Sequence, residues 1–241
     1  MGRMVELSKR MQAVADMVSA GSRVCDVGCD HGYVSIYLLQ SKRAPAALSM
    51  DINQGPLLKA REHIRKYDVE DYITLRISDG LAAYQKGEAD TLLCAGMGGR
   101  LLMNILSREP DKTADFKELV LQPQSEIPVF RKFLREKGYY FLKEDIVLEG
   151  GKFYPIMKVA KGKVQGEKEP RIQAMEDLLG PLLLQQRHPV LWQYLKREIA
   201  IRQEILNKLE KQEASDRAAL RKKQLQQELK LLQSAEELWD A

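Results

Sequence analysis

The residues best suited to do chemistry lie within residues 23–33, whose sequence is RVCDVGCDHGY. A short run with strand character ends at Gly28, and Asp30, His31 and Gly32 follow it. This order is typical of a strand that ends in a tight turn and leads into a helix. Dinucleotide sites place G-x-G-x-x-G at such a turn, so that a pyrophosphate binds the backbone N–H groups at the helix N-terminus.

Here two carboxylates accompany the glycines, because the order is D-x-G-x-D-x-G from Asp26 to Gly32. Asp26 and Asp30 would repel a pyrophosphate, but they suit a ligand that carries an amine and a sulfonium cation. S-adenosylmethionine is such a ligand. The turn therefore predicts a methyl-donor site, in which Gly28 forms the turn and Asp26 or Asp30 accepts a hydrogen bond from the ammonium group.

Acidic residues or glycines also end the next three predicted strands. Asp51 comes 23 residues after Gly28, at the place where an acidic side chain meets ribose hydroxyls in nucleotide-binding folds. Asp79 and Gly80 end the third strand, where a carboxylate can accept from an adenine amino group. Each residue alone is ordinary turn chemistry. Together they follow the rule that ligands bind at the carboxyl ends of strands in open α/β sheets.

The fourth strand ends in the glycine-rich sequence AGMGG, residues 95–99, where Gly96 and Met97 allow the backbone to approach a cofactor. It lacks the Gly-Lys-Ser/Thr ending of a phosphate loop. The fifth strand ends in Leu-Gln-Pro-Gln, and the Gln122 amide can pair with the edge of a substrate base, although a strand-ending proline explains the sequence nearly as well. Asp30, His31 and Gln122 are the candidate catalytic residues, for positioning and charge stabilisation. His31 has an alternative role as a structural residue at the helix start.

The elements that must hold these residues alternate strand and helix. Five apolar strands with β-branched residues are predicted at 23–28, 46–52, 73–78, 90–95 and 118–122, with helices at about 6–18, 32–41, 55–68, 99–107 and 126–137. Such βα units imply a parallel sheet with right-handed crossovers. Two more strands, 139–148 and 153–160, join through Glu-Gly-Gly as a hairpin. The fold class is therefore α/β, a Rossmann-like methyltransferase sheet closed by an antiparallel hairpin.

The chain changes character after the hairpin. Residues 161–170 are polar, with two glycines and a proline, and no strand is predicted beyond them. Glycine and proline divide the rest into one short helix and two long ones, whose leucines keep near-heptad spacing and predict an antiparallel coiled-coil hairpin. We therefore expect a methyltransferase domain over residues 1–165 and a helical coiled-coil domain over 166–241.

Composition sets the remaining bounds. The 241 residues carry a net charge of +4, a mild basic excess that is compatible with a polyanionic partner. No apolar run of about 18 residues and no signal-peptide pattern is present, and we expect a cytoplasmic protein with no membrane association.

The three cysteines are expected to be reduced core thiols. An iron–sulfur motif C-x-x-x-C-x-x-C would need its third cysteine at position 32, which is Gly32. No metal site is predicted, and a monomer is expected.

Several motifs in combination make the sequence resemble a known family. They are LSKR at 7–10, DVGCDHGY, the strand ending in Asp51, SDGL at 78–81, AGMGG, LQPQ at 121–124 and GKFYPI at 151–156. Together they resemble the bacterial tRNA (adenine-22 N1)-methyltransferase family over essentially the whole chain. The resemblance implies S-adenosylmethionine as methyl donor and N1 of a tRNA adenine as acceptor. It places the cofactor site on Asp26, Gly28, Asp30, His31, Asp51, Asp79, Gly80, Gly96 and Met97.

Three other functions stay open at this point. A Rossmann-type oxidoreductase would need G-x-G-x-x-G, which the carboxylates replace. A non-catalytic RNA-binding adaptor would not need to keep Asp51 and Asp79. A methyltransferase that acts on another RNA or on a small molecule is disfavoured only mildly, by the helical tail and the local basic clusters.

Overall fold

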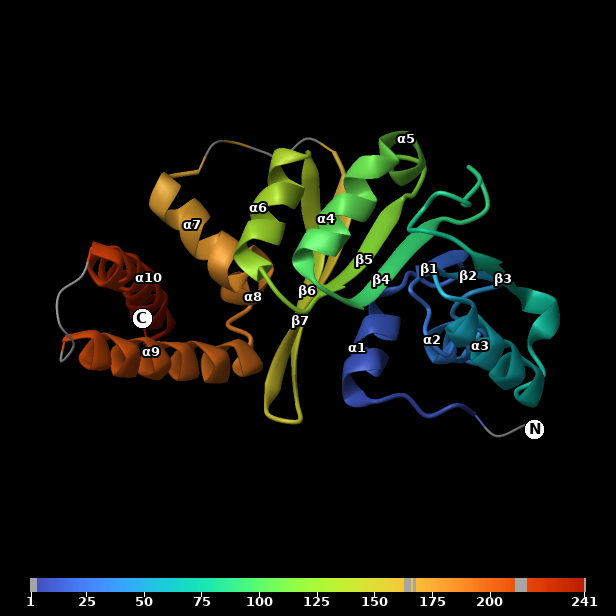
Figure 1. Ribbon diagram of the computed structural model, residues 1–241, viewed down its shortest axis with the longest axis horizontal. Coiled ribbons are helices and arrows are strands. Elements are labelled where there is room, and N and C mark those ends of the chain that lie inside the picture. The colour runs from blue at the N-terminus through green and yellow to red at the C-terminus, as the bar shows by residue number, and fades with distance from the viewer. Residues whose placement is uncertain (1–3, 163–165, 167, 211–215, 241) are drawn as a thin grey trace. The chain divides into compact units, whose positions relative to one another are not determined.

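The computed structural model describes residues 4–162, 166, 168–210 and 216–240. The chain divides into two compact units, Met1–Gln165 and Gly166–Ala241, and each is described by itself. The first unit is built on a seven-stranded sheet in the order β3-β2-β1-β4-β5-β7-β6 (Figure 1). Its strands are β1 (Val24–Val27), β2 (Ala47–Asp51), β3 (Ile73–Ile77), β4 (Thr91–Met97), β5 (Glu118–Pro123), β6 (Tyr139–Glu149) and β7 (Lys152–Lys161).

Strands β1 to β5 pair in parallel, and β7 pairs antiparallel with both β5 and β6. Every residue of β1 and β5 is buried, as expected for parallel strands that are covered on both faces. The order reverses between β1 and β4, which are neighbours although two βα units separate them along the chain. Ligands bind at such a switch point, outside the carboxyl ends of the strands. The α/β fold class with its closing hairpin is confirmed.

Helices cover the two faces of the sheet, and alternate residues of each strand face each layer (Figure 1). On one face α4 (Gly99–Arg108) and α6 (Ile127–Glu136) pack on a cluster that includes Cys25, Leu92 and Leu119. On the other face lie α1 (Lys9–Met17), α2 (Tyr33–Gln40) and α3 (Gln54–Lys66). Leu93 and Val120 belong to the cluster under α1 and α2. The side chains that follow in register, Ala95 and Gln122, therefore point towards α1.

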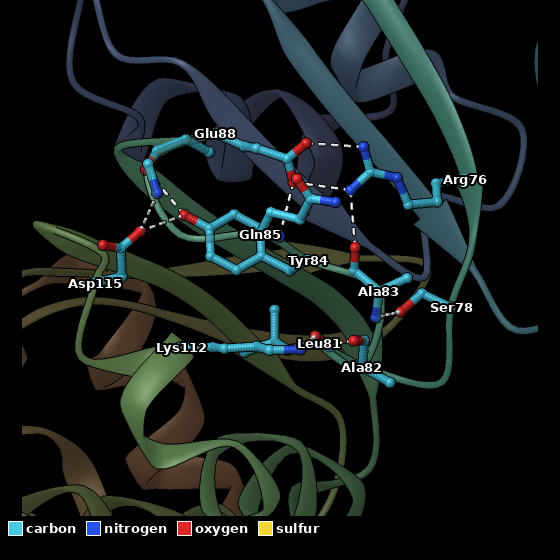
Figure 2. A network of polar contacts seen from close by, with 12 residues as sticks. Arg76, Ser78, Leu81, Ala82, Ala83, Tyr84, Gln85, Glu88, Lys112 and Asp115 are labelled. Carbon is cyan, nitrogen blue, oxygen red and sulfur yellow. Dashed lines mark hydrogen bonds and ion pairs between the residues drawn. The ribbon is translucent and has the colours of Figure 1, made fainter.

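The connection from β3 to β4 is held against the sheet by side-chain hydrogen bonds (Figure 2). Both terminal nitrogens of Arg76 donate to the Glu88 carboxylate, at 2.7 and 2.8 Å. The hydroxyl of Tyr84, which is 1% exposed, donates to Oδ2 of Asp115 at 2.6 Å. Lys112 Nζ donates to the backbone carbonyls of Leu81 and Ala82. Lys112 belongs to α5 (Pro110–Thr113).

The second unit consists of helices. Two short ones, α7 (Pro170–Leu179) and α8 (Pro181–Gln185), precede α9 (Pro189–Glu210) and α10 (Asp216–Asp240). Trp192 of α9 stacks on Trp239 of α10, with ring centroids 5.4 Å apart. Further along α9, Arg202 pairs with Glu228 at 2.8 Å and Glu210 with Lys222 at 3.0 Å. Because residue numbers rise along α9 while their partners fall along α10, the two helices run antiparallel.

The predicted elements agree with the structure in type, with differences at their edges. The first helix begins at Lys9, not at residue 6, because the Ser8 hydroxyl accepts from the Met11 N–H and caps it there. Two short helices, α5 and η1 (Glu70–Tyr72), were not predicted, since single turns carry no periodicity. The tail has two short helices before its long ones because the backbone at Gly180, with φ of 99°, separates α7 from α8.

Candidate active site

A cavity of about 390 Å³ opens at the carboxyl ends of β1 and β4, the switch point of the sheet. This volume lies in the range of small-molecule sites. The described residues that line it all belong to the first unit. They are Arg10, Met11, Asp26, Gly28, Cys29, Asp30, His31, Tyr33, Val34, Leu93, Ala95, Gly96, Met97 and Gln124.

The turn after β1 has the backbone geometry that its glycines require. Gly28 has φ of +72°, and the N–H groups of Gly28 and Cys29 both donate to the Met50 carbonyl. A Cβ atom on Gly28 would lie 2.1 Å from Cε of Met97. Asp30 also takes a positive φ, 49°, a conformation that Asp tolerates better than most residues. The positive φ at Gly28 favours glycine, and the end of the Met97 side chain would have to move to admit a Cβ there.

Asp26 is the buried acid of the site. Its carboxylate accepts from Ser35 Oγ at 2.9 Å, and Ser49 Oγ donates to Ser35 Oγ at 2.8 Å. Burial raises the pKa of Asp26 to about 6, although the Ser35 hydrogen bond acts in the opposite direction, and the charge of Asp51 raises it further. A carboxylate in this state gains stability from a cation placed beside it. The arrangement would let Asp26 accept a hydrogen bond from an ammonium group, the role that the sequence predicts for it.

His31 and its neighbours form an aromatic cluster at the start of α2. The Tyr33 ring stacks on His63 with centroids 4.5 Å apart, and the Tyr33 hydroxyl lies 3.2 Å from His63 Nε2. Nε2 of His31 lies 3.5 Å from the Asp30 carboxylate. Nδ1 of His31 is buried and has no hydrogen-bond partner in the structure. A buried polar atom without a partner costs free energy, so a ligand that forms a hydrogen bond with it is favoured.

The end of β4 contains a bulge between Ala95 and Met97, opposite the end of β5. Gly96 occupies the bulge with φ of +79°, and its N–H donates to Oε1 of Gln122 at 3.1 Å. Nε2 of Gln122 donates to the Pro123 carbonyl. Gln122 is fully buried, and the hydrogen bonds of its amide go to other groups of the protein. It shapes the wall of the cavity without lining it.

Arg10 enters the cavity from α1. Its Nη1 donates to Oε1 of Gln122 at 3.0 Å, and its guanidinium carbon lies 5.0 Å from the ring centroid of Tyr154 on β7. The Arg10 N–H donates to Oε1 of Glu149 at the end of β6. The start of α1 is therefore joined to both strands of the closing hairpin.

The structure brings six of the predicted cofactor residues into one cavity: Asp26, Gly28, Asp30, His31, Gly96 and Met97. Asp51 lies one strand away at the end of β2, where its carboxylate accepts from the Asn53 N–H. Asp79 pairs with Arg108 at 2.6 Å on the surface, and neither it nor Gly80 lines the cavity. Roles for Asp51, Asp79 and Gly80 stay predictions. Gln122 lies behind the wall, as described above.

Sequence reasoning assigned no site role to Arg10, Tyr33 or Gln124, all of which line the cavity. The sequence did contain signals for them. Arg10 ends the LSKR motif, Tyr33 ends DVGCDHGY and Gln124 ends LQPQ. A motif by itself does not tell which of its side chains faces a cavity, because that depends on how the elements pack.

The cysteines are thiols of the core, as their positions in or beside apolar strands predict. Cys25, Cys29 and Cys94 are free and buried, and burial raises the pKa of each thiol. Among the described residues, no cluster of three His, Cys, Asp or Glu side chains has the arrangement of a metal site. Within the same part of the chain, no helix has the length and apolar character needed to cross a bilayer.

Comparison with known proteins agrees with this geometry. Residues 7–157 match the family described as "Methyltransferase domain". The chain is therefore a methyltransferase-fold protein, and its cavity lies at the switch point where open α/β sheets bind ligands. It is 30% identical to the tRNA (adenine(22)-N(1))-methyltransferase of Bacillus subtilis, over 95% of this chain and 96% of the relative. The chain therefore belongs to the tRNA (adenine(22)-N(1))-methyltransferase family, and the resemblance seen in its motifs is confirmed.

Solved structures agree over the same length. The crystal structure of the B. subtilis M1A22 tRNA methyltransferase TrmK superposes with a TM-score of 0.85 at 30% identity, covering 96% of this chain and 99% of the other. A Streptococcus pneumoniae protein, described as a putative tRNA (m1A22) methyltransferase in complex with S-adenosyl-L-methionine, gives a TM-score of 0.83 at 28% identity. That match covers 95% of this chain and 99% of the other. The likeness thus includes the helical tail.

Proposed function

We propose that this protein transfers a methyl group from S-adenosylmethionine to N1 of adenine 22 in tRNA. Membership of the tRNA (adenine(22)-N(1))-methyltransferase family supports the reaction and the substrate. The observation that carries the proposal for this chain is its cavity at the switch point, which places a buried acid, Asp26, beside the bare backbone of Gly28 and Gly96.

The residues of the cavity fit the cofactor. Gly28 and Gly96 both have positive φ, and nothing lies closer than 3.6 Å to a Cβ placed on Gly96, so a ligand can lie against that backbone. Asp26 offers an acceptor to an ammonium group, and His31 Nδ1 is a buried polar atom that has no hydrogen-bond partner among the described residues. We expect Asp51 to accept from the ribose hydroxyls and Asp79, with Gly80, to border the adenine.

Bound in this cavity, S-adenosylmethionine supplies an electrophilic methyl group on a positively charged sulfur. Adenine N1 holds a free lone pair at neutral pH, so the protein needs no general base before attack. Its own task is to align the base with the methyl group and to exclude water. Asp30 and His31 lie side by side in the cavity lining. The Asp30 carboxylate would stabilise the positive charge that adenine acquires when N1 is methylated. Gln122 acts through the groups it holds, Gly96 and Arg10.

A tRNA adenine reaches a cavity of this kind only when its nucleotide is turned out of the folded RNA. Basic side chains around the rim and the helical tail are expected to bind the phosphate backbone and to recognise shape. Activity on tRNA is consistent with a monomeric, cytoplasmic enzyme that uses no metal.

Nucleoside mass spectrometry after incubation with unmodified tRNA transcripts and S-adenosylmethionine tests the proposal. We expect 1-methyladenosine in a transcript with A22 and none in a matched transcript with G22. A protein that methylates free adenosine as efficiently as tRNA would be a small-molecule enzyme. One that binds tRNA without methyl transfer would be an adaptor. Either result would contradict the proposal.

A further inference from the structure

One side-chain amide lines the cavity on the side of β5. Among the described residues of the lining, Gln124 is the one that follows β5, and it is exposed. Its amide forms no hydrogen bond within the described part of the chain. Gln122, two residues earlier, is buried and has partners at both ends of its amide. Of these two glutamines, Gln124 is therefore the one that can offer a donor and an acceptor to a ligand.

The order of the strands separates this amide from the residues expected to hold the cofactor. Gly28 follows β1, Asp51 ends β2 and Asp79 follows β3. In the sheet, β1, β2 and β3 lie on one side of β4, and β5 lies on the other. A cofactor that spreads from β1 towards β3 leaves the β5 side of the cavity to the second substrate. Gln124 is thus placed to contact the methyl acceptor.

Hydrogen bonds hold the loop that carries this amide. The Gln124 N–H donates to the Met97 carbonyl at 2.8 Å, and the Gly99 N–H donates to Ser125 Oγ at 3.3 Å. A Cβ placed on Gly99 would lie 2.6 Å from the Ser125 carbonyl oxygen, so the loop after β5 lies directly against the start of α4. The backbone of Gln124 is therefore fixed on the end of β4.

Glu126 completes this attachment. Its backbone has φ of 54°, in the left-handed region that few residues other than glycine adopt. Oε2 of Glu126 accepts from the Arg100 N–H at 3.1 Å, and Oε1 pairs with Nε of Arg100. The dipole of α4 also favours a carboxylate at its first turn. These contacts offset the cost of the left-handed backbone and hold the loop closed on α4.

The chemistry of the acceptor favours an amide at this place. N1 of adenine must stay free of hydrogen bonds, because its lone pair attacks the methyl group. Recognition can then use the N6 amino group and N7, the edge that asparagine and glutamine read in DNA through a pair of hydrogen bonds. The Gln124 oxygen would accept from N6, and its nitrogen would donate to N7. Guanine presents two acceptors on this edge, O6 and N7, so the amide oxygen would have no donor there.

We propose that Gln124 binds the N6 and N7 edge of the acceptor adenine and selects adenine over guanine, and that Glu126 positions Gln124 for this contact. The inference rests on the proposed function, because it takes a tRNA adenine as the acceptor. A phosphate is a poorer partner here, since the amide is uncharged and two acids, Asp26 and Asp30, line the same cavity. Gln124 aligns the base and takes no part in proton transfer.

Methyl-transfer kinetics with two tRNAs test the assignment. One tRNA carries A22, and the other carries 7-deazaadenine there, which keeps N1 and the N6 amino group but has a C–H in place of N7. For wild type we expect kcat/KM to be about 10- to 100-fold lower on the 7-deazaadenine tRNA, because one hydrogen bond is lost and the amide nitrogen is left without a partner. Gln124→Leu should be slower than wild type on A22 by a similar factor, and it should distinguish the two tRNAs by no more than about twofold.

A further variant makes the test independent of folding. Gln124→Glu keeps an acceptor for N6 but faces N7 with a negative charge, so it should prefer the 7-deazaadenine tRNA over A22. The ratio of the two rates belongs to one variant, and it does not depend on the fraction of protein that is folded. Gln85→Leu is the matched control, because Gln85 is an exposed glutamine of the first unit that does not line the cavity. It should keep the wild-type rates.

Glu126→Ala tests the positioning role. Its preference for A22 over 7-deazaadenine should fall between those of wild type and Gln124→Leu, because the loop no longer fixes the amide. Glu126→Gln keeps an oxygen for the Arg100 N–H, and it should retain most of the wild-type preference. A loss of activity in Glu126→Ala with an unchanged preference would overturn the positioning role, since Glu126 would then serve stability alone.

The remaining outcomes separate the inference from the proposed function. Equal rates of wild type on the two tRNAs, or an unchanged preference in Gln124→Leu, would overturn the inference alone. Calorimetry should show that Gln124→Leu binds S-adenosylhomocysteine within about twofold of wild type. A loss of that affinity as large as the loss of activity would place Gln124 in the cofactor site and overturn its role towards adenine. If wild type bound S-adenosylhomocysteine but formed no 1-methyladenosine in the A22 tRNA, the proposed function would fail, and the inference with it.

Discussion

Asp26 shows how one buried side chain makes ligand binding depend on pH. Its carboxylate accepts from one hydroxyl, that of Ser35, and pairs with no cation among the described residues. Burial raises its pKa to about 6. The free protein therefore binds a proton at Asp26 below about pH 6. A ligand ammonium group favours the ionised form, so ligand binding and protonation compete at this residue.

We expect the affinity for S-adenosylhomocysteine to rise with pH up to about 6 and to level off above about pH 7. At pH 5 the affinity should be roughly tenfold below its plateau, since one pH unit corresponds to a tenfold change for one proton. Asp26→Asn should bind more weakly at pH 7.5 and lose this dependence, whereas 5′-methylthioadenosine, which has no ammonium group, should not show it in wild type. Calorimetry across pH 5–8 measures all three. A pH-independent wild type would contradict the role of Asp26.

Asp51 and Asp79 make a second residue-scale prediction, because both lie outside the lining of the cavity. Asp51→Ala should weaken cofactor binding by about 1–3 kcal/mol, the cost of a lost charge-assisted hydrogen bond. Asp79→Ala should do the same and also free Arg108 from its ion pair. Asp111→Ala is the control, because Asp111 is an exposed residue of α5. Wild-type affinity in both variants would remove Asp51 and Asp79 from the cofactor site.

At the scale of elements, the β3–β4 connection shows why a loop between two strands can be rigid. The Tyr84 hydroxyl donates to Asp115 and also lies 3.3 Å from the Ala89 carbonyl. Burial, together with the hydrogen bond to Asp115, raises the pKa of Tyr84, while the same bond and the Gly87 N–H lower the pKa of Asp115. These contacts fix the segment that follows Asp79 and Gly80.

Tyr84→Phe should lower the free energy of unfolding by about 1–2 kcal/mol, because the partners of the hydroxyl lose a hydrogen bond inside the protein. Urea denaturation measures the change. Tyr72→Phe serves as the matched control, since the Tyr72 side chain is 56% exposed, and it should stay within about 0.5 kcal/mol of wild type. Equal effects of the two substitutions would mean that the Tyr84 hydroxyl adds nothing specific.

For the whole molecule, the proposed function assigns cofactor binding to the first unit and tRNA positioning to the helical tail. Within the described parts of the chain, the residues that line the cavity lie in the first unit. The closing hairpin is complete at Lys161, and the Gly162 N–H bonds back to Gly138. The tail from Arg171 onward carries 12 basic and 11 acidic residues, so it has little net charge with which to attract RNA.

A protein that ends at Gly162 should fold and bind S-adenosylhomocysteine with near wild-type affinity, but it should lose most tRNA methylation. The reason is that the rim of the cavity alone does not hold a nucleic acid in register. Circular dichroism, calorimetry and nucleoside mass spectrometry measure the three properties. Full activity of the shortened protein would make the tail a stability or assembly device. Loss of cofactor binding would make the tail part of the fold of the first unit.

Local patterns in the amino-acid sequence suffice to predict the strands and the edge of the sheet at which the cavity opens. Apolar runs and turn residues predicted all seven strands, because strand pattern and turn chemistry are local properties of the chain. The acids and glycines that end β1 and β4 came together in one cavity because parallel strands bring their carboxyl ends to the same edge.

Which amide and guanidinium groups reach that cavity depends instead on long-range packing. Arg10 meets Gln122 across 112 residues of sequence, and this contact depends on how α1 packs on the sheet. Alternation along β5 turns Gln122 towards α1 and buries it, while Gln124, beyond the end of the strand, reaches the cavity. The local pattern marks both glutamines equally. Their different roles follow from long-range packing, which no short window of sequence contains.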